Sequence, residues 1–212
     1  GTNAIRLFIS NVEEYPTETL FKKIAFLRVP IRLGEDVFTT GEIGQQKRKR
    51  LCETMQGFSY IMSAFNVESY KAYATCAMRE ARNGKSVAEQ IQKECDLNIE
   101  IISGTKEAET IFAGGMNEVV DDDKTYLYVD VGGGSTEVIV YSKSVKVEAC
   151  SFPLGTVRML NDAVDKEEMK HFKKWLKNIT EKYTPDAIIG SGGNINKIHK
   201  LLNKKERERI TY

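Results

Sequence analysis

The chain has 212 residues, 41% of them hydrophobic and 29% charged, which suits a soluble globular protein with a substantial core. Its formal net charge is +1, so nothing global attracts nucleic acid or a membrane, and affinity for a polyanion must come from local clusters of Lys and Arg. No apolar stretch is long enough to cross a bilayer and no signal-peptide pattern is present, so we expect a cytoplasmic protein.

The first half of the chain opens with two predicted strands, Ala4 to Val12 and Phe21 to Leu33. From Gln45 to Phe65, apolar residues recur every three or four positions and predict a long amphipathic helix. Its first six residues, QQKRKR, are either the solvated face of this helix or a patch for a polyanion. Shorter predicted elements follow: a strand at Ser69 to Thr75, helices at Met78 to Asn83 and Ser86 to Cys95, a strand at Asn98 to Ile102, and a helix through Glu107 to Phe112.

The second half begins after the acidic stretch Asp121 to Lys124 and echoes the order of elements in the first. Its predicted elements are strands at Thr125 to Val131, Thr136 to Ser142 and Val145 to Ser151, a helix at Lys166 to Tyr183, a strand at Asp186 to Ile189, and a helix at Asn194 to Asn203. Such an echo favours two related α/β domains around a cleft. We place the boundary near Gly114 to Lys124, with domains at residues 1–116 and 117–212.

Cysteine and histidine contribute little to the predicted chemistry. The four cysteines lie far apart without a CxxC pair, which argues against a zinc site or a disulfide framework. Only His171 and His199 are available as imidazole groups, so acid and base chemistry must fall to carboxylates.

The segment YVDVGGGSTEVI, Tyr128 to Ile139, runs from an apolar strand through three glycines and two hydroxyl residues into another strand. Glycine lets the backbone approach a ligand closely, so a turn of this kind can aim N–H groups and hydroxyls at one phosphate. The segment lacks the Gly-Lys-Ser/Thr ending of a Walker loop, and a strand rather than a helix follows it, which excludes the dinucleotide fingerprint. The alternative is a flexible hairpin tip.

Two carboxylates flank this glycine turn, Asp130 at the end of the first strand and Glu137 at the start of the second. If both face the same cleft they could hold Mg²⁺, a hard cation that prefers oxygen ligands and bound phosphates. The alternative for Glu137 is a strand residue that faces solvent.

A second glycine turn lies in Asp186 to Leu202, where a strand leads through Gly190, Ser191, Gly192 and Gly193 to Asn194 and a helix. A helix N-terminus placed in this way can bind an anion, although a tight turn with no ligand has the same pattern. In the first half, the matching position is Gly1, Thr2 and Asn3, followed by a strand that contains Arg6. If the halves correspond, a strand ending in an acidic residue is expected before Gly1.

Six segments in order resemble the exopolyphosphatase and guanosine pentaphosphatase family, whose fold is that of the actin, Hsp70 and sugar kinase superfamily. They are GTNAIRLFI at Gly1 to Ile9, ATCAMREARNG at Ala74 to Gly84, IISGTKEAE at Ile101 to Glu109, VDVGGGSTEVIV at Val129 to Val140, FPLGTVRM at Phe152 to Met159, and IGSGGN at Ile189 to Asn194. The resemblance implies an α/β fold with two ribonuclease H-like (actin-like ATPase) domains flanking a cleft.

The same resemblance implies roles for particular residues. Glu107 would orient or deprotonate the attacking water, Arg79 would bind phosphate, and Asp130 and Glu137 would place Mg²⁺ or another divalent cation. The phosphate-binding loops would be Gly1, Thr2 and Asn3 with Arg6, and Gly132, Gly133, Gly134, Ser135 and Thr136; Gly190 to Asn194 would hold a nucleotide or a second anion. This set suits phosphoryl transfer, which needs an in-line nucleophile and positive charge on the non-bridging oxygens. The alternatives are a surface position for Arg79 and, for Glu107, a carboxylate that complements the helix dipole.

The chain departs from the family around Glu107, where Lys106 replaces the usual glutamate and Glu109 the usual arginine. We therefore keep three hypotheses: hydrolysis of the terminal phosphate of polyphosphate, hydrolysis of guanosine pentaphosphate, and a polyphosphate-binding module without turnover. A sugar kinase or actin-like ATPase fits the surroundings of Glu107 poorly. We expect a homodimer with no nucleic-acid or membrane partner.

Overall fold

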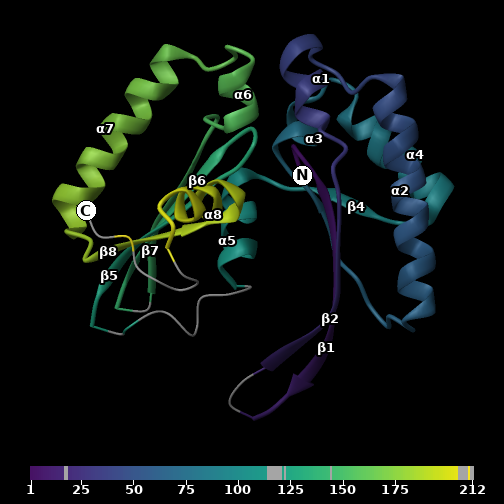
Figure 1. The fold of residues 1–212 in the computed structure, drawn as a ribbon, viewed down its shortest axis with the longest axis horizontal. Coiled ribbons are helices and arrows are strands. Elements are labelled where there is room, and N and C mark those ends of the chain that lie inside the picture. The colour runs from purple at the N-terminus through teal and green to yellow at the C-terminus, as the bar shows by residue number, and fades with distance from the viewer. Residues whose placement is uncertain (17–18, 114–120, 122, 144, 205–209, 211–212) are drawn as a thin grey trace. The chain divides into compact units, whose positions relative to one another are not determined.

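The computed structural model describes residues 1–16, 19–113, 121, 123–143, 145–204 and 210. It forms two compact units, Gly1–Ile102 and Ser103–Tyr212, which are treated separately below (Figure 1). Most of the boundary expected near Gly114 to Lys124 lies outside the described residues. Helix α5 (Gly104–Ala113), which precedes that expected boundary, packs on strands of the second unit.

The first unit begins with a long antiparallel hairpin of β1 (Ile5–Glu14) and β2 (Thr19–Val29) (Figure 1). Alternate side chains of β1 face the core, as period-two patterning requires, and Ile9 is buried among them. The second strand was predicted to end at Leu33, but β2 ends at Val29. Pro30 has no N–H with which to continue the ladder, and Arg32 turns the chain with a φ of 59°.

Helix α1 (Leu33–Thr40), which the sequence analysis did not predict, follows that turn. The long helix α2 (Gln45–Ala64) and helix α4 (Gly84–Cys95) were both predicted, and they pack against each other. The short helix α3 (Cys76–Glu80) begins two residues before its predicted start. The remaining strands, β3 (Ala72–Ala74) and β4 (Ile99–Ile101), form a parallel pair.

The basic cluster at the start of α2 is partly neutralised within the first unit. Lys47 forms ion pairs with Glu35 and Asp36 at 3.0 and 2.7 Å. Arg50 donates a hydrogen bond to the carbonyl oxygen of Pro30. Arg48 lines a groove between α2 and α4. The cluster is thus spread around the first turns of the helix and divided between internal contacts, the groove and solvent.

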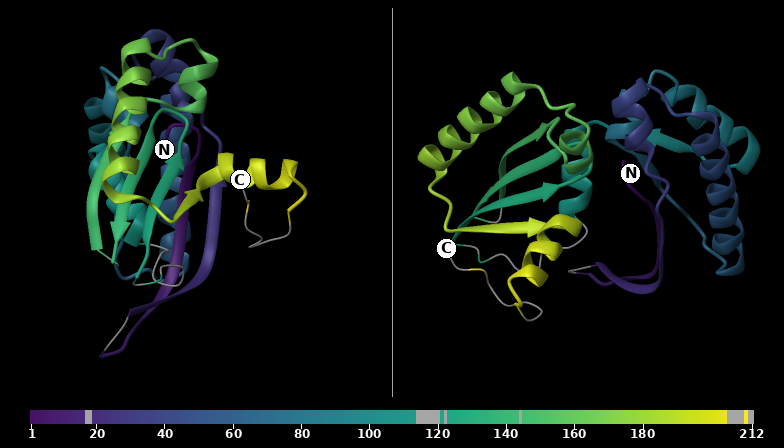
Figure 2. Two further views of the ribbon diagram at one scale, coloured as in Figure 1. Left: turned by 90° about the vertical axis from the view of Figure 1, so that its left-hand side faces the viewer. Right: turned by 45° about the horizontal axis from the view of Figure 1, so that its top comes forward.

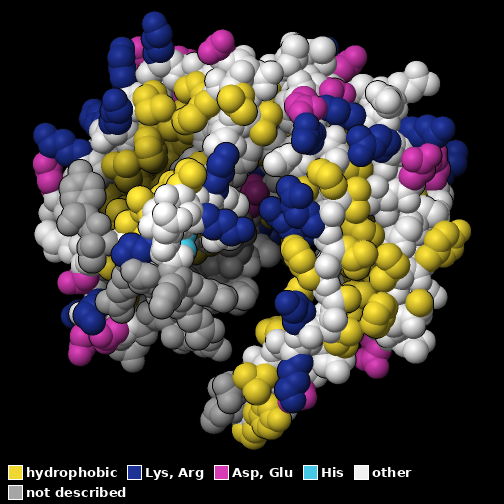
Figure 3. Space-filling view, viewed as in Figure 1, with side chains coloured by type: hydrophobic (Ala, Val, Ile, Leu, Met, Phe, Trp, Pro, Cys, Tyr) yellow, Lys and Arg dark blue, Asp and Glu magenta, His cyan; other side chains and the backbone are white. Residues whose placement is uncertain are grey.

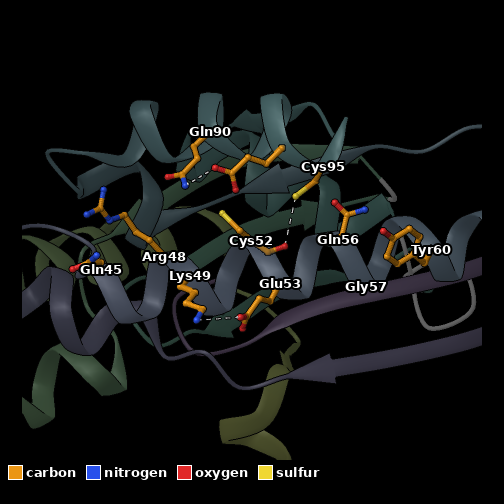
Figure 4. A pocket seen from close by; sticks show the side chains of 11 residues that line it. Gln45, Arg48, Lys49, Cys52, Glu53, Gln56, Gly57, Tyr60, Gln90 and Cys95 are labelled. Atoms are coloured by element: carbon orange, nitrogen blue, oxygen red, sulfur yellow. Dashed lines mark hydrogen bonds and ion pairs between the residues drawn. The ribbon is translucent and has the colours of Figure 1, made fainter.

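The groove between α2 and α4 has a volume of about 820 Å³ and contains none of the residues predicted for the phosphate site (Figure 4). Its walls carry both charges, including Lys49, Glu53 and Glu94, and the thiols of Cys52 and Cys95. Burial raises the pKa of the Cys52 thiol to about 11, so this thiol stays protonated at neutral pH.

Gly57 lies in the middle of α2 beside this groove, and a Cβ placed on it would meet no atom within 4 Å. Glycine in a helix interior costs roughly 0.5–1 kcal/mol relative to alanine. We therefore expect Gly57→Ala to raise the free energy of unfolding by about that amount, as measured by urea unfolding. A destabilised variant would contradict the open space seen beside Gly57.

The second unit contains a four-stranded sheet in the order β7-β6-β5-β8 (Figure 2). Its strands are β5 (Thr125–Val131), β6 (Thr136–Ser142), β7 (Val145–Phe152) and β8 (Ala187–Ser191). The pairs β5–β6 and β6–β7 are antiparallel, whereas β5 and β8 are parallel. The central position of β6 explains why Val138, Ile139 and Val140 are completely buried.

The two faces of this sheet are covered differently. Helix α7 (Lys166–Tyr183) packs on one face, where Phe152 meets the rings of Phe172 and Trp175 edge to face. Helix α5 packs on β6 and β7, and helix α8 (Gly192–Leu201) packs on β5 and β8. The short helix α6 (Thr156–Leu160), which was not predicted, lies between β7 and α7 in the chain. Strand β8 extends to Ser191, so α8 begins at Gly192 rather than at the predicted Asn194.

The two units repeat one order of elements, as the sequence analysis proposed. A hairpin, a short helix and a long helix follow each other as β1, β2, α1 and α2 in the first unit and as β6, β7, α6 and α7 in the second. A parallel strand then comes next in each, β3 in the first unit and β8 in the second. The assignment of each unit as a ribonuclease H-like domain stays a prediction.

The described surface includes an apolar region on the first hairpin, where Phe8, Val12, Phe21 and Phe26 are exposed (Figure 3). Among the residues described, no helix has the length and apolar character needed to cross a membrane.

Candidate functional site

Four polar side chains form a row across the end of the second unit's sheet. Ser151, Glu137, Asp130 and Ser191 are successive cross-strand partners on β7, β6, β5 and β8. Cross-strand partners point to the same face of a sheet, so the strand register alone brings two carboxylates and two hydroxyls together. The next row inward is largely apolar and consists of Ala149, Ile139, Tyr128 and Ile189.

Glu137 is the most buried charged group of this row, with 1% of its surface exposed. The solvent-facing alternative for this residue is therefore wrong. Ser151 Oγ donates to Glu137 Oε1 at 2.9 Å, and the Ser135 hydroxyl also bonds the carboxylate. The pKa of Glu137 is raised to about 7, chiefly by burial and also by the nearby carboxylates of Glu107 and Asp130, although the two serine hydroxyls act in the opposite direction.

Glu107 approaches this row from the first turn of α5. Acidic residues favour that position because they complement the positive end of the helix dipole. Ser103 supports the turn, since its Oγ accepts a hydrogen bond from the N–H of Lys106. The carboxylates of Glu107 and Asp130 thus both act on the carboxylate of Glu137 in the second unit.

The raised pKa of Glu137 predicts a pH dependence of stability in metal-free protein. In the folded state Glu137 stays protonated above pH 4.5, the ordinary pKa of a glutamate. The contribution of this proton to stability is therefore complete below pH 4.5 and is lost as the pH rises toward 7. The loss should be on the order of 3 kcal/mol, because the pKa rises from 4.5 to about 7 and each unit corresponds to about 1.4 kcal/mol. Urea unfolding in the presence of a chelator measures it. In Glu137→Gln this loss should disappear, and an unchanged pH profile would contradict the assignment.

The glycine turn between β5 and β6 is held through its carbonyl oxygens by the start of α6. Gly132 O accepts from Thr156 N at 3.1 Å, and Gly133 O accepts from Val157 N at 2.8 Å. Arg158 Nε donates to Gly134 O at 3.0 Å. The turn is therefore fastened to a helix and is not a flexible hairpin tip.

This fastening also orients the amide groups of the turn. In a trans peptide the C=O and the following N–H point in opposite directions. The three held carbonyls therefore turn the N–H groups of Gly133, Gly134 and Ser135 away from α6. Among the described residues, no acceptor is recorded for these three N–H groups. Three similarly directed N–H groups make a concavity suited to an anion.

The second predicted glycine turn is a direct junction of β8 with α8. Gly192 has a φ of +85°, and a Cβ on it would come closer than 3.0 Å to Asp130 Oδ1. Asn194 Nδ2 donates to the carbonyl oxygen of Val131. Tyr128 donates its hydroxyl hydrogen to Ser191 Oγ at 2.6 Å. The start of α8 is thereby tied to the end of β5 that carries Asp130.

The predicted loop of the first unit has a similar local structure. Thr2 is buried, and its carbonyl oxygen accepts from Gly34 N of α1 at 2.9 Å. Arg6 lies directly opposite Arg28 on the hairpin, a like-charge pair that is unfavourable without an anion nearby.

Arg79, the other predicted phosphate-binding residue of the first unit, is half-buried in α3 and donates to the carbonyl oxygen of Ile102 at 2.7 Å.

The second unit thus brings together Glu107, Asp130, Glu137 and the glycine turn, all of which were predicted. Three further residues, Ser151, Gly155 and Arg158, were missed as site residues. They lie in or next to the segment FPLGTVRM, which was noted only as a resemblance, and nothing in their spacing shows that they contact the turn.

The sequence pattern of the Ppx/GppA phosphatase family matches residues 12–203, which is most of the chain. The chain belongs to this family. The Ppx/GppA membership inferred from the six segments is thereby confirmed. The structure is similar to that of an exopolyphosphatase from Cytophaga hutchinsonii, with a TM-score of 0.84 and 25% identity over all of this chain and 70% of that one. The α/β fold class is confirmed by this likeness.

Two curated relatives of this Ppx/GppA chain differ in length. The bifunctional 3-dehydroquinate synthase/phosphatase of Fusobacterium nucleatum is 30% identical over 75% of this chain. Exopolyphosphatase 1 of Mycobacterium tuberculosis is 23% identical over 95% of it. The chain spans 24% of the length of the first relative and 61% of the second.

Proposed function

We propose that this protein hydrolyses the terminal phosphate of inorganic polyphosphate by attack of water. The row of Glu137 and Asp130 beside the oriented N–H groups of the glycine turn carries the proposal. Family membership supports it, as does the likeness to named exopolyphosphatases. An N–H concavity beside carboxylates suits a phosphate whose charge is shared with a cation.

Each group has a role in that reaction. The N–H groups of Gly133, Gly134 and Ser135 bind the non-bridging oxygens of the terminal phosphate. Glu107 accepts a proton from the attacking water, which makes that water a better nucleophile. Arg79 and the first loop, Gly1 to Asn3 with Arg6, supply further anion contacts, as the family resemblance implies. Gly190 to Asn194 hold a second anion or a nucleotide.

Asp130 and Glu137 are the residues that would hold Mg²⁺. Among the described residues, no group of three or more His, Cys, Asp or Glu side chains is arranged to hold a metal ion alone. This agrees with Mg²⁺, which keeps several waters and uses one or two carboxylates together with substrate phosphates. When bound, it neutralises charge on the phosphates. A cation beside Glu137 would also lower the raised pKa of that buried carboxyl.

The test is orthophosphate release from long-chain polyphosphate by the full-length protein with Mg²⁺. Turnover of polyphosphate in preference to guanosine pentaphosphate, with both present in competition, supports the proposal. Preference for guanosine pentaphosphate would select the second hypothesis of the sequence analysis, hydrolysis of guanosine pentaphosphate. Tight binding of polyphosphate without release would mean a binding module and would overturn hydrolysis. The homodimer and the cytoplasmic location stay predictions.

A further inference from the structure

Arg158 lies in the last turn of α6 and reaches back to the glycine turn. Its backbone N–H donates to Gly133 O at 3.1 Å, and its Nε donates to Gly134 O at 3.0 Å. One residue therefore bonds two consecutive carbonyls of the turn. Arg158 is partly buried, and its contact with Gly134 O is a charge-assisted hydrogen bond, which is stronger than a neutral one.

The bond to Gly134 O has a consequence for Ser135. The C=O of Gly134 and the N–H of Ser135 belong to one peptide plane, so fixing the first fixes the direction of the second. Ser135 is 4% exposed, and its hydroxyl bonds the Glu137 carboxylate. Arg158 is thereby connected, through a single peptide group, to a residue that touches both the N–H concavity and Glu137.

The two N–H groups that precede Arg158 already donate to other carbonyls of the turn. The N–H groups of Thr156 and Val157 hold the carbonyls of Gly132 and Gly133. Among the described residues, the group that donates a hydrogen bond to Gly134 O is the Arg158 side chain. A peptide unit flanked by glycine can rotate at low cost, because glycine has no Cβ to restrict it. Without Arg158, this peptide is the least constrained of the three.

We propose that Arg158 is a positioning residue that holds the Gly134–Ser135 peptide with its N–H directed at the terminal phosphate. The inference rests on the proposed function, because it assigns the turn to a phosphate. It concerns orientation and not contact: Arg158 acts through the peptide and need not touch the substrate.

Two substitutions of equal length separate the hydrogen bond from the charge. In glutamine, Nε2 stands as many bonds from Cα as the arginine Nε does, and it keeps an N–H donor without the charge. In methionine, Cε occupies that position and donates nothing. We expect Arg158→Met to bind inorganic phosphate about tenfold more weakly than Arg158→Gln, the scale of one lost hydrogen bond to an anion. Calorimetric titration of the full-length protein with inorganic phosphate, with and without Mg²⁺, measures both.

A purely structural role would give a different result. It would lower the melting temperature of Arg158→Met and leave phosphate affinity equal in the two variants at temperatures where both are folded. Equal affinities, or an Arg158→Met affinity equal to that of the unmodified protein, would overturn the inference. If Arg158→Met does not fold, a tenfold or greater loss of affinity in folded Arg158→Gln would overturn it as well, because glutamine keeps the donor.

Arg82 provides the matched control, since its guanidinium also donates to a backbone carbonyl, that of Thr40, in the first unit. Arg82→Met and Arg82→Gln should bind inorganic phosphate equally well. Phosphate binding needs no turnover, so the comparison remains valid if polyphosphate is not hydrolysed. Failure of hydrolysis and failure of the positioning role are therefore separate outcomes.

Discussion

Replacing Glu107 by glutamine is expected to lower the rate of orthophosphate release from polyphosphate by at least about a hundredfold, the scale of a positioned general base. Glutamine has almost the same shape but cannot accept a proton from water. Glu107 lies near enough to Glu137 to raise the pKa of that carboxyl, so its charge is felt at the row of polar side chains. The measurement is kcat in a steady-state assay of orthophosphate release with Mg²⁺.

Glu109→Gln is the control for this substitution, because Glu109 lies on the same helix and is ion-paired with Lys146 on β7. An exposed ion pair contributes little, so this variant should keep its rate within about threefold. Equal rates for Glu107→Gln and the unmodified protein would remove Glu107 from the mechanism. Equal losses in both variants would point to a general effect of α5 on the fold.

Elements with strong internal patterning could be predicted to the residue. Strands Thr125–Val131 and Thr136–Ser142 and helix Lys166–Tyr183 have the bounds that the sequence analysis gave them. The two strands are dominated by apolar side chains and are separated by glycines, and the helix has an amphipathic pattern that begins after Asp165, whose carboxylate accepts from Glu167 N. Local sequence decides such elements.

Helices α1 and α6 could not be predicted in this way. They contain eight and five residues, which is too short for helical periodicity to show and too short for a helix to be stable alone. Each depends on contacts with a loop that is remote in sequence: α1 bonds Thr2 O, and α6 bonds the carbonyls of Gly132 and Gly133. Tertiary hydrogen bonds, and not local propensity, make these residues helical.

The site residues likewise divide into those placed by local sequence and those placed by tertiary contacts. Asp130 and Glu137 could be placed because they flank one turn, and a hairpin of that length makes them partners. Ser151 joins them only through the register of β6 with β7, which contains an irregularity between Val140 and Tyr141. Arg158 reaches Gly134 across 24 residues of sequence. Contacts set by register and by a short helix have no signature in sequence spacing.

Gly155 carries the second large prediction, because it stands where the backbone leading into α6 meets the backbone of the glycine turn. A Cβ on Gly155 would come closer than 3.0 Å to Gly133 C, Gly133 O and Gly134 N. Atoms of folded proteins do not approach so closely, and backbone atoms cannot swing aside as a flexible side chain can. Even alanine must therefore push α6 and the turn apart.

We expect Gly155→Ala to lower kcat/KM for polyphosphate by about a hundredfold or more, since removing one donor from a preorganised anion site already costs that much. Overpacking should also reduce the free energy of unfolding by about 1–3 kcal/mol. Steady-state rates measured well below the melting temperature separate the two effects. Gly57→Ala is the control, because its Cβ meets open space and its activity should not change. Normal turnover by Gly155→Ala would mean that the turn functions without the contact that holds its carbonyls, and the orientation of its N–H groups would then have no role in catalysis.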